Sequence, residues 1–203
     1  LNMLEPFDLQ RLGWGSSRLT HLMVEAEKRA YSDRAEYLGD PDFFDIPLET
    51  LISKKYARER FKDFGWDRVS KSDQISHGNI TIQESRETTH FSVMSSDGMA
   101  VSFTTTLNSP YGNKIVIPGA GFLLNNEMDD FSIKANVMNQ YDLLGREANS
   151  IKPNKRMLSS MSPTLVVKDG MPVLVTGSPG GSTIITTVLQ VIINFLDHKM
   201  PLH

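Results

Sequence analysis

The chain has 203 residues, a hydrophobic fraction of 39% and a formal net charge of -3. This length and apolar content suffice for one globular domain with a core, or for part of a larger one. The small acidic excess argues against nucleic acid as the main partner, because a surface that tracks phosphates needs a basic excess. Without cysteine there is no disulfide framework, thiolate metal site or cysteine nucleophile. The most apolar run, residues 183–196, is too short to span a bilayer.

The first third of the chain predicts two helices. The first begins at Ser16 or Ser17, where a serine can cap it, and stops before Gly39. Glu25 and Arg29 have the i, i+4 spacing of an ion pair, which we expect on its solvent-exposed face. The second helix runs from Pro47 to Gly65. The two apolar stripes consist of Leu19, Leu22, Met23, Ala26, Ala30 and Tyr31, and of Leu48, Leu51, Ile52, Tyr56 and Phe61.

After a polar, aperiodic connection over residues 69–87, the pattern changes to short strands. Two hairpins are predicted, residues 88–94 with 99–107 and residues 164–167 with 172–176, each around a glycine-containing turn. A further short strand covers residues 115–117. Residues 184–196 predict a buried helix, because they are apolar on nearly every side. Helices, then strands and one buried helix, indicate an α+β fold with helices layered on sheets.

Residues 177–182, Gly-Ser-Pro-Gly-Gly-Ser, join the last strand to the last helix. They lack the lysine of a Walker loop and the spacing of GxGxxG, so nucleotide binding is not expected. Two interpretations stay open: a tight turn, or backbone N–H groups that bind a phosphate or a developing oxyanion. The five histidines show no metal-ligand spacing, and an acidic trio in a loop is typical of a solvated surface. We expect no metal and no cofactor.

Threonine hydroxyls are the remaining candidates for a nucleophile. No histidine pattern supports a Ser-His-Asp triad. A threonine can instead be activated when the peptide bond before it is cut, because its new α-amine lies beside its own hydroxyl and can act as a base. Thr88 begins a strand directly after the polar connection, which is the layout that this scheme requires. Threonine also favours strands for packing reasons alone, so both interpretations remain open at this point.

Motifs along nearly the whole chain resemble bacterial γ-glutamyltranspeptidases, which belong to the N-terminal nucleophile hydrolase superfamily. The motifs are residues 25–31, 33–41, 88–93, 106–108, 121–131, 153–156, 158–164 and 177–182. The resemblance implies part of an αββα sandwich and autocatalytic cleavage between Glu87 and Thr88. Residues 1–87 are similar to the end of the family's large subunit, and residues 88–203 to the start of its small catalytic subunit. We therefore expect an interior fragment that spans the subunit junction.

The resemblance also implies roles for single residues. Thr88 would attack the γ-carbonyl of γ-glutamyl compounds such as glutathione, and Thr106 would hydrogen-bond and steady it. The acyl-enzyme would pass its glutamyl group to water or to the amine of an amino acid or peptide. The other implied roles are Asn108, Glu127 and Asp130 at the substrate's α-ammonium, Ser159 and Ser160 at its α-carboxylate, Gly180 and Gly181 as the oxyanion hole, and Tyr141 in a lid.

Further expectations follow from the same resemblance. The large and small subunits of one precursor would associate as a heterodimer, and the protein would be periplasmic or secreted, without nucleic acid and without a membrane span in this fragment. The family's arginine for the α-carboxylate lies upstream of this chain, so the fragment alone should be inactive. The alternatives are a related acylase, either a glutaryl β-lactam acylase or a polyglutamate transferase, and an uncleaved inactive precursor that acts as a binding protein.

Overall fold

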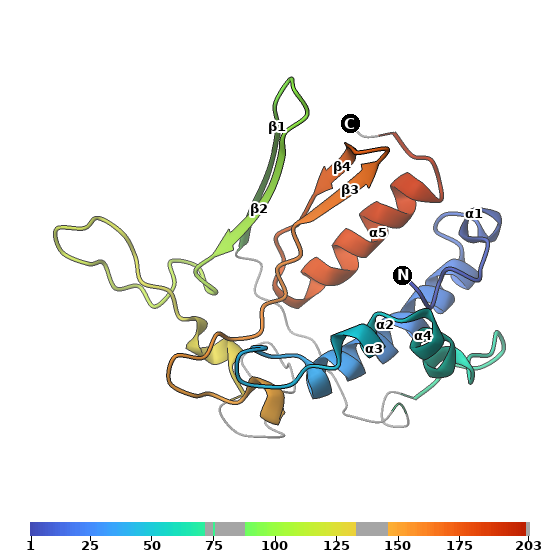
Figure 1. Cartoon of the computed structure of the whole chain (residues 1–203), viewed down its shortest axis with the longest axis horizontal. Helices are drawn as coiled ribbons and strands as arrows, with labels where there is room; N and C mark the ends of the chain where they lie inside the picture. Colours follow the sequence, from blue (N-terminus) through green and yellow to red (C-terminus); the bar gives the residue numbers. More distant parts are fainter. Residues whose placement is uncertain (72–74, 76–87, 133–145, 202–203) are drawn as a thin grey trace.

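The computed structural model describes residues 1–71, 75, 88–132 and 146–201. Figure 1 shows α2, α3 and α4 below the last helix, α5 (Ile184–Leu196), with α1 to its right and the two hairpins on its other side. The helices and strands are α1 (Leu9–Leu12), α2 (Ser17–Tyr37), α3 (Leu48–Leu51), α4 (Lys54–Phe61), β1 (Thr88–Met94), β2 (Ala100–Thr106), β3 (Thr164–Lys168), β4 (Met171–Thr176) and α5 (Ile184–Leu196), with the 3-10 turns η1 (Glu127–Asp130), η2 (Glu147–Asn149) and η3 (Gly181–Thr183).

The first predicted helix is confirmed as α2. Ser16 caps it, because the Leu19 N–H donates to Ser16 Oγ over 3.1 Å. Leu19, Leu22 and Ala26 of its predicted stripe are buried in one core cluster with Leu4, Leu9 and Phe61, and Ile193 of α5 belongs to the same cluster. Ala30 of the predicted stripe is exposed. The helix therefore joins the N-terminal segment to the last helix of the chain.

The ion pair of α2 forms, but its expected exposure was wrong. Arg29 Nη1 lies 2.9 Å from Glu25 Oε2, yet both residues are only 1% exposed. The segment after α4 crosses this face of the helix: Arg29 also donates to Asp63 Oδ1 at 2.8 Å and to the Arg60 carbonyl at 2.8 Å. Ser70 closes the network, since its N–H donates to Glu25 Oε1. The pair is therefore buried by the end of α4 and the segment after it, and the i, i+4 spacing within α2 cannot predict that these residues cover it.

The second predicted helix is broken into α3 and α4, so the prediction of one continuous helix was wrong. Ser53 interrupts it because its Oγ accepts the Tyr56 N–H at 3.1 Å and caps α4. As a result, Leu48 and Ile52 of the expected stripe are 56% and 63% exposed, whereas Phe61 is in the core. The strand expected at residues 115–117 is reduced to an isolated bridge between Val116 and Leu123. Most of the connection at residues 69–87 lies outside the described residues.

Both predicted hairpins are confirmed. β1 pairs antiparallel with β2 from Thr88 opposite Thr106 to Met94 opposite Ala100. β3 pairs antiparallel with β4 across the two-residue turn Asp169–Gly170. Both turn residues have positive φ, 53° and 79°, as a type I′ hairpin turn requires.

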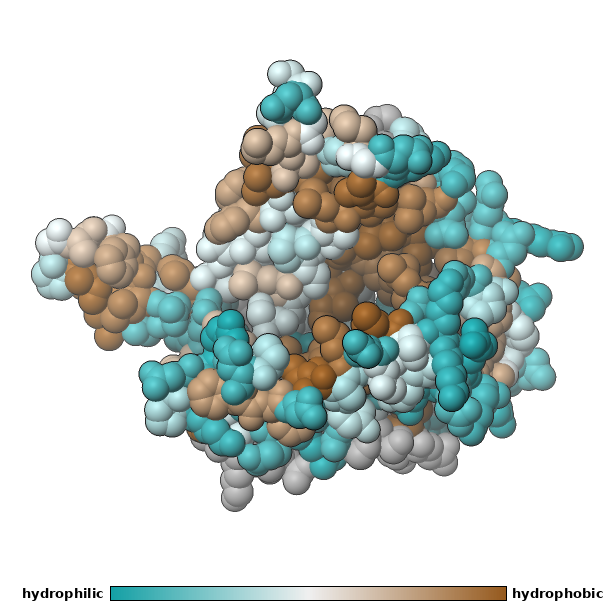
Figure 2. Space-filling model, in the orientation of Figure 1, coloured by the Kyte–Doolittle hydropathy of each residue, from teal (hydrophilic) through white to brown (hydrophobic). Residues whose placement is uncertain are grey.

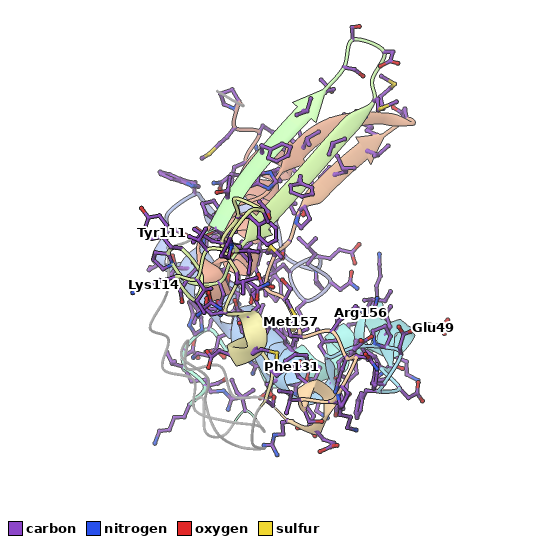
Figure 3. The ribbon with its side chains drawn as sticks, turned by 90° about the vertical axis from the view of Figure 1, so that its left-hand side faces the viewer. Glu49, Tyr111, Lys114, Phe131, Arg156 and Met157 are labelled. Carbon is purple, nitrogen blue, oxygen red and sulfur yellow. The ribbon has the colours of Figure 1, made fainter. Side chains whose placement is uncertain are left out.

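The hairpins and helices are stacked in layers, which confirms the α+β class. Ser102 Oγ of β2 donates to the Thr176 carbonyl of β4 at 2.8 Å, so the two hairpins lie face to face, as Figures 1 and 3 show. The other face of β3–β4 packs on α5, where Leu174, Ile184, Val188 and Ile192 form a second core cluster. The order β1–β2, β3–β4, α5 with α2 supplies two strand layers and one helical layer of the expected sandwich.

The two faces of the β1–β2 hairpin differ sharply in polarity. Phe91 and Phe103 lie on the outward face with their ring centroids 5.1 Å apart, and each is 47% exposed. Figure 2 shows hydrophobic side chains gathered over the hairpins and α5. The inward face carries hydroxyls and a histidine instead, so it is the polar face that lies against β3–β4. Within the described ranges, no helix is long and apolar enough to cross a membrane.

Candidate functional site

A row of polar side chains occupies the inward face of the β1–β2 hairpin. Side chains alternate between the faces of a strand, so each inward residue of β1 meets an inward residue of β2. Thr88 and Thr106 form the pair at the open end of the hairpin, where they, their neighbours Thr89 and Thr105, and the loop after β2 line a cavity of about 260 Å³. The predicted nucleophile and its predicted partner therefore lie opposite each other beside an open space. The pairs that follow are His90 with Thr104 and Ser92 with Ser102.

Asn108 lies two residues after the end of β2 and connects Thr106 to the acidic turn η1. Its backbone N–H donates to Thr106 Oγ1 at 2.9 Å. Its side-chain nitrogen donates to the Asn126 carbonyl at 3.2 Å, one residue before Glu127. Asn108 is buried and has a φ of 74°, a left-handed conformation that asparagine tolerates better than most residues. This bend follows β2, and the side chain of Asn108 connects the end of the hairpin to the residue before the acidic turn.

The carboxylates of η1 repel one another in a partly buried place. The pKa of Asp130 is raised to about 7, first by burial and then by the charges of Glu127 and Asp129, while Arg34 opposes the shift. Burial also raises the pKa of Glu127. Negative charges that raise each other's pKa are stabilised by a cation between or beside them. The turn thus favours a ligand with an ammonium group.

Asn149 joins the acidic turn to the two serines. It is 6% exposed, and its Nδ2 donates to the Asp130 carbonyl at 2.7 Å. Its Oδ1 accepts the Leu158 N–H at 3.0 Å, directly before Ser159. One buried side chain therefore sets the spacing between the candidate ammonium site and the candidate carboxylate site. Figure 3 labels Phe131 and Met157, which lie near η1 at the ends of these two segments.

Ser159 and Ser160 both accept hydrogen bonds from groups that cannot accept in return. Ser159 Oγ accepts the Met161 N–H at 3.1 Å, and Ser160 Oγ accepts from Arg34 Nη2 at 3.0 Å. Backbone N–H and guanidinium groups have no lone pair to offer, so each serine hydroxyl must direct its own proton elsewhere. Two hydroxyl donors side by side suit an anion such as a carboxylate.

The glycine-rich segment forms a tight turn at the start of η3 and α5. Gly180 and Gly181 have φ values of 129° and 56°, where any residue with a Cβ is strained. The Gly180 carbonyl accepts from the N–H of Thr183 at 3.1 Å and from its Oγ1 at 2.6 Å. The positive end of the α5 dipole lies at this turn. Both readings of the segment are therefore compatible: it is a tight turn, and its backbone lies at the positive end of a helix.

The turn also packs directly on β1. A Cβ built on Gly177 would lie 2.2 Å from Cε1 of His90, so the backbone touches the histidine ring. The ring is held in place by Thr104 Oγ1 at 2.8 Å and Ser92 Oγ at 3.0 Å. His90 thus spaces the strand that begins at Thr88 from the segment that leads to Gly180.

Sequence reasoning missed four residues that organise this region: Tyr31, Arg34, His90 and Asn149. The alternation of β1 could have placed His90 on the face of Thr88. No local signal pointed to Arg34, whose partner Ser160 lies 126 positions away. Glu87 and Tyr141, the other two predicted site residues, lie outside the described residues. The remaining predicted residues are connected by the contacts above.

The chain is similar in sequence to parts of longer known proteins. A glutathione hydrolase proenzyme of Escherichia coli (strain K12) is 52% identical over 200 residues, which are 98% of this chain and 34% of that protein. The acylase ACY 1 proenzyme of Pseudomonas sp. (strain SE83) is 38% identical over 203 residues, 100% of this chain and 34% of that protein. The chain therefore spans about a third of the length of these relatives.

Solved structures support the same assignment. The γ-glutamyltranspeptidase from Pseudomonas nitroreducens complexed with L-DON has a TM-score of 0.54 and 55% identity, over 56% of this chain and 58% of that one. A cephalosporin acylase from Bacillus halodurans has a TM-score of 0.75 over 98% of this chain and 33% of that one; at 23% identity this likeness shows the fold alone. The family model described as Gamma-glutamyltranspeptidase matches residues 1–203. Because the match covers every residue, the chain belongs to the γ-glutamyltranspeptidase family.

Proposed function

We propose that the intact protein is a self-cleaving γ-glutamyltransferase and glutathione hydrolase with Thr88 as its nucleophile. The observation that carries the proposal is the pairing of Thr88 with Thr106 at the open end of β1–β2. Hydrogen bonds lead from Thr106 through Asn108 to the acidic turn, so the nucleophile's strand is tied to a site for a cation. Membership of the family and the name of the Escherichia coli relative support the substrate class.

The proposed chemistry begins with hydrolysis of the Glu87–Thr88 peptide bond, which consumes one water and leaves a carboxylate and an α-amine. The amine takes the proton of Thr88 Oγ while the oxygen attacks the γ-carbonyl of the substrate. The carbon–nitrogen bond breaks, the departing amine takes that proton, and a γ-glutamyl ester of Thr88 remains. Water or the amine of an amino acid or peptide then attacks the ester and restores the hydroxyl.

Each remaining candidate has one part in this scheme. Thr106 hydrogen-bonds Thr88 and steadies it, and the N–H groups of Gly180 and Gly181 stabilise the oxyanion. Tyr141 belongs to a lid over the bound substrate. The substrate's head group is held at both ends: Asn108, Glu127 and Asp130 bind its α-ammonium, and Ser159 and Ser160 donate to its α-carboxylate.

The first test is an intact mass spectrum of purified protein. Wild type should give two pieces, the smaller beginning at Thr88, whereas Thr88→Ala should stay in one piece. Thr89→Ala is the matched control, because Thr89 is the next residue of the same strand and is exposed on the opposite face. Wild type and Thr89→Ala should both cleave. An uncut wild type would overturn the proposal and favour the inactive precursor that acts as a binding protein.

A related acylase is the second candidate, supported by the ACY 1 proenzyme as a relative. The two activities differ in the head group, because a glutaryl compound lacks the α-ammonium. Burial and the neighbouring carboxylates raise the pKa of Asp130, so a cationic head group would be attracted to this turn, which supports the γ-glutamyl substrate. Wild type should prefer γ-glutamyl over glutaryl 4-nitroanilide, and Asp130→Asn should lose most of that preference. A wild-type preference for the glutaryl compound would favour the acylase.

The proposed architecture divides the chain at the cleavage site. Residues 1–87 are the end of the large subunit and residues 88–203 the start of the small one, and the two remain associated as a heterodimer. Their shared core, in which Leu22 of α2 clusters with Ile193 of α5, supports this association. We place the protein in the periplasm or outside the cell, and fractionation of the native host would test that location.

A further inference from the structure

Arg34 reaches the candidate carboxylate site from a different part of the chain. It lies in the last two turns of α2, upstream of the proposed cleavage site, whereas Ser160 belongs to the downstream piece. Its Nη2 donates to Ser160 Oγ at 3.0 Å. The charge of Arg34 also lowers the pKa of Asp130 in the acidic turn. One guanidinium thus acts on groups proposed to bind both ends of the substrate's head group.

The bond to Arg34 determines where the proton of Ser160 points. A hydroxyl has one proton and two lone pairs, and a guanidinium has donors but no acceptor. When Arg34 occupies a lone pair of Ser160, the proton cannot turn toward Arg34 and is directed away from it. A carboxylate placed there receives a hydrogen bond whose donor is already oriented, and the nearby positive charge attracts the same anion.

The same face of α2 also holds the glycine turn. Tyr31 lies three residues before Arg34, on the same side of the helix. Its hydroxyl is buried and donates to the Ser182 carbonyl at 2.5 Å, directly after Gly181. Two neighbouring side chains of α2 therefore hold the serine segment and the oxyanion turn at a set distance from each other.

We propose that Arg34 is a positioning residue of the substrate site, which acts through Ser160 to orient its hydroxyl toward the substrate's α-carboxylate. This inference rests on the proposed function. It means that the upstream piece contributes to substrate recognition after the chain is cut, and not only to folding. The site is complete only while the two pieces stay together.

The test compares two substrates in the intact, self-cleaved protein: γ-glutamyl 4-nitroanilide and its decarboxylated analogue, 4-aminobutanoyl 4-nitroanilide. For Arg34→Met we expect KM for the γ-glutamyl compound to rise about 10-fold to 100-fold, the range for a lost hydrogen bond to a charged group, with kcat nearly unchanged. The analogue has no carboxylate, so its kinetics should be the same in wild type and variant when both are measured well above pH 7, where Asp130 is ionised with or without the charge of Arg34. Arg58→Met, on the exposed part of α4, is the matched control and should change neither substrate.

A double-mutant cycle separates action through Ser160 from a general effect. In a Ser160→Ala background, Arg34→Met should add little to KM, because the hydroxyl it orients is absent. If Arg34→Met does not fold or does not cleave itself, Arg34→Lys keeps the charge and should raise KM several-fold, again only when Ser160 is present.

Three results would overturn the inference: unchanged KM in both Arg34 variants, equal losses on both substrates, or additive effects with Ser160→Ala. Each of these results is measured against a wild type that turns over the γ-glutamyl compound, so none of them refutes the proposed function. A wild type that turns over neither anilide refutes the proposed function, and the inference falls with it.

Discussion

Gly177→Ala should destabilise the protein by forcing the glycine turn away from His90. The new Cβ would lie 2.2 Å from Cε1, 2.3 Å from Nδ1 and 2.8 Å from Nε2 of the ring. The optimal separation of non-bonded carbon atoms is about 3.5–4.0 Å, so the ring or the turn must move by about 1 Å or more. Moving the ring breaks its bonds to Thr104 and Ser92. At about 0.5–1.5 kcal/mol for each bond and about 1–3 kcal/mol for overpacking, the free energy of unfolding should fall by roughly 2–6 kcal/mol.

The assay is urea unfolding in a Thr88→Ala background, where every variant is one uncut chain. His90→Ala removes the ring and leaves room for the new methyl, so Gly177→Ala should cost much less when His90 is already alanine. We expect a coupling of about 1–3 kcal/mol between the two substitutions. Gly119→Ala is the control: its φ is +80° and no atom lies within 4 Å of the new Cβ, so its cost is backbone strain and should not depend on His90. Strictly additive effects of Gly177→Ala and His90→Ala would refute the reasoning.

Three further predictions concern charged groups that are wholly or partly buried. Arg29→Met should lower the free energy of unfolding by up to about 3–5 kcal/mol, because the buried carboxylate of Glu25 then keeps only Lys28 as a cationic partner, and Glu25→Gln in the same chain should recover part of that loss in urea unfolding. The pKa of Glu25 is lowered to about 2, because bonds from Ser70, Lys28 and Arg29 outweigh the burial that raises it. Its stabilisation is therefore fully present above about pH 4.5 and is lost as the pH falls toward 2, a loss that Glu25→Gln should not show. In the active protein, kcat/KM for γ-glutamyl 4-nitroanilide should rise as the pH increases through about 7, since ionised Asp130 binds the ammonium. Glu127→Gln should move that inflection to lower pH, and a shift to higher pH would contradict the cause given for the raised pKa.

Local patterns were enough to predict the elements near the site. The period-2 pattern and glycine-containing turns gave both hairpins, and the unbroken apolar run gave α5. These features depend on neighbours within a few residues, where backbone preference and side-chain alternation dominate. Where a local competitor was overlooked, the prediction was wrong: Ser53 caps α4 and divides the helix expected from Pro47 to Gly65.

The residues of the candidate site were predicted one by one from resemblance, but which of them lie opposite or contact one another came only from the fold. The strand register places Thr88 opposite Thr106, and that register follows from the hairpin itself. The link from Asp130 through Asn149 to the serines depends on loops that carry no periodic signal.

By itself, the sequence determined the family, the α+β class, the two hairpins and the threonine at the start of β1. Motifs and short-range periodicity can be read from the sequence without knowing which segments pack together. Only the tertiary structure decided that Glu25 and Arg29 are buried, that His90 separates β1 from the glycine turn, and that Arg34 reaches Ser160. Each of these contacts joins segments distant in the chain or covers a face that looks solvent-exposed in isolation. These contacts form only when the layers pack, because an unpaired buried charge or hydroxyl is costly and most such groups therefore find a partner.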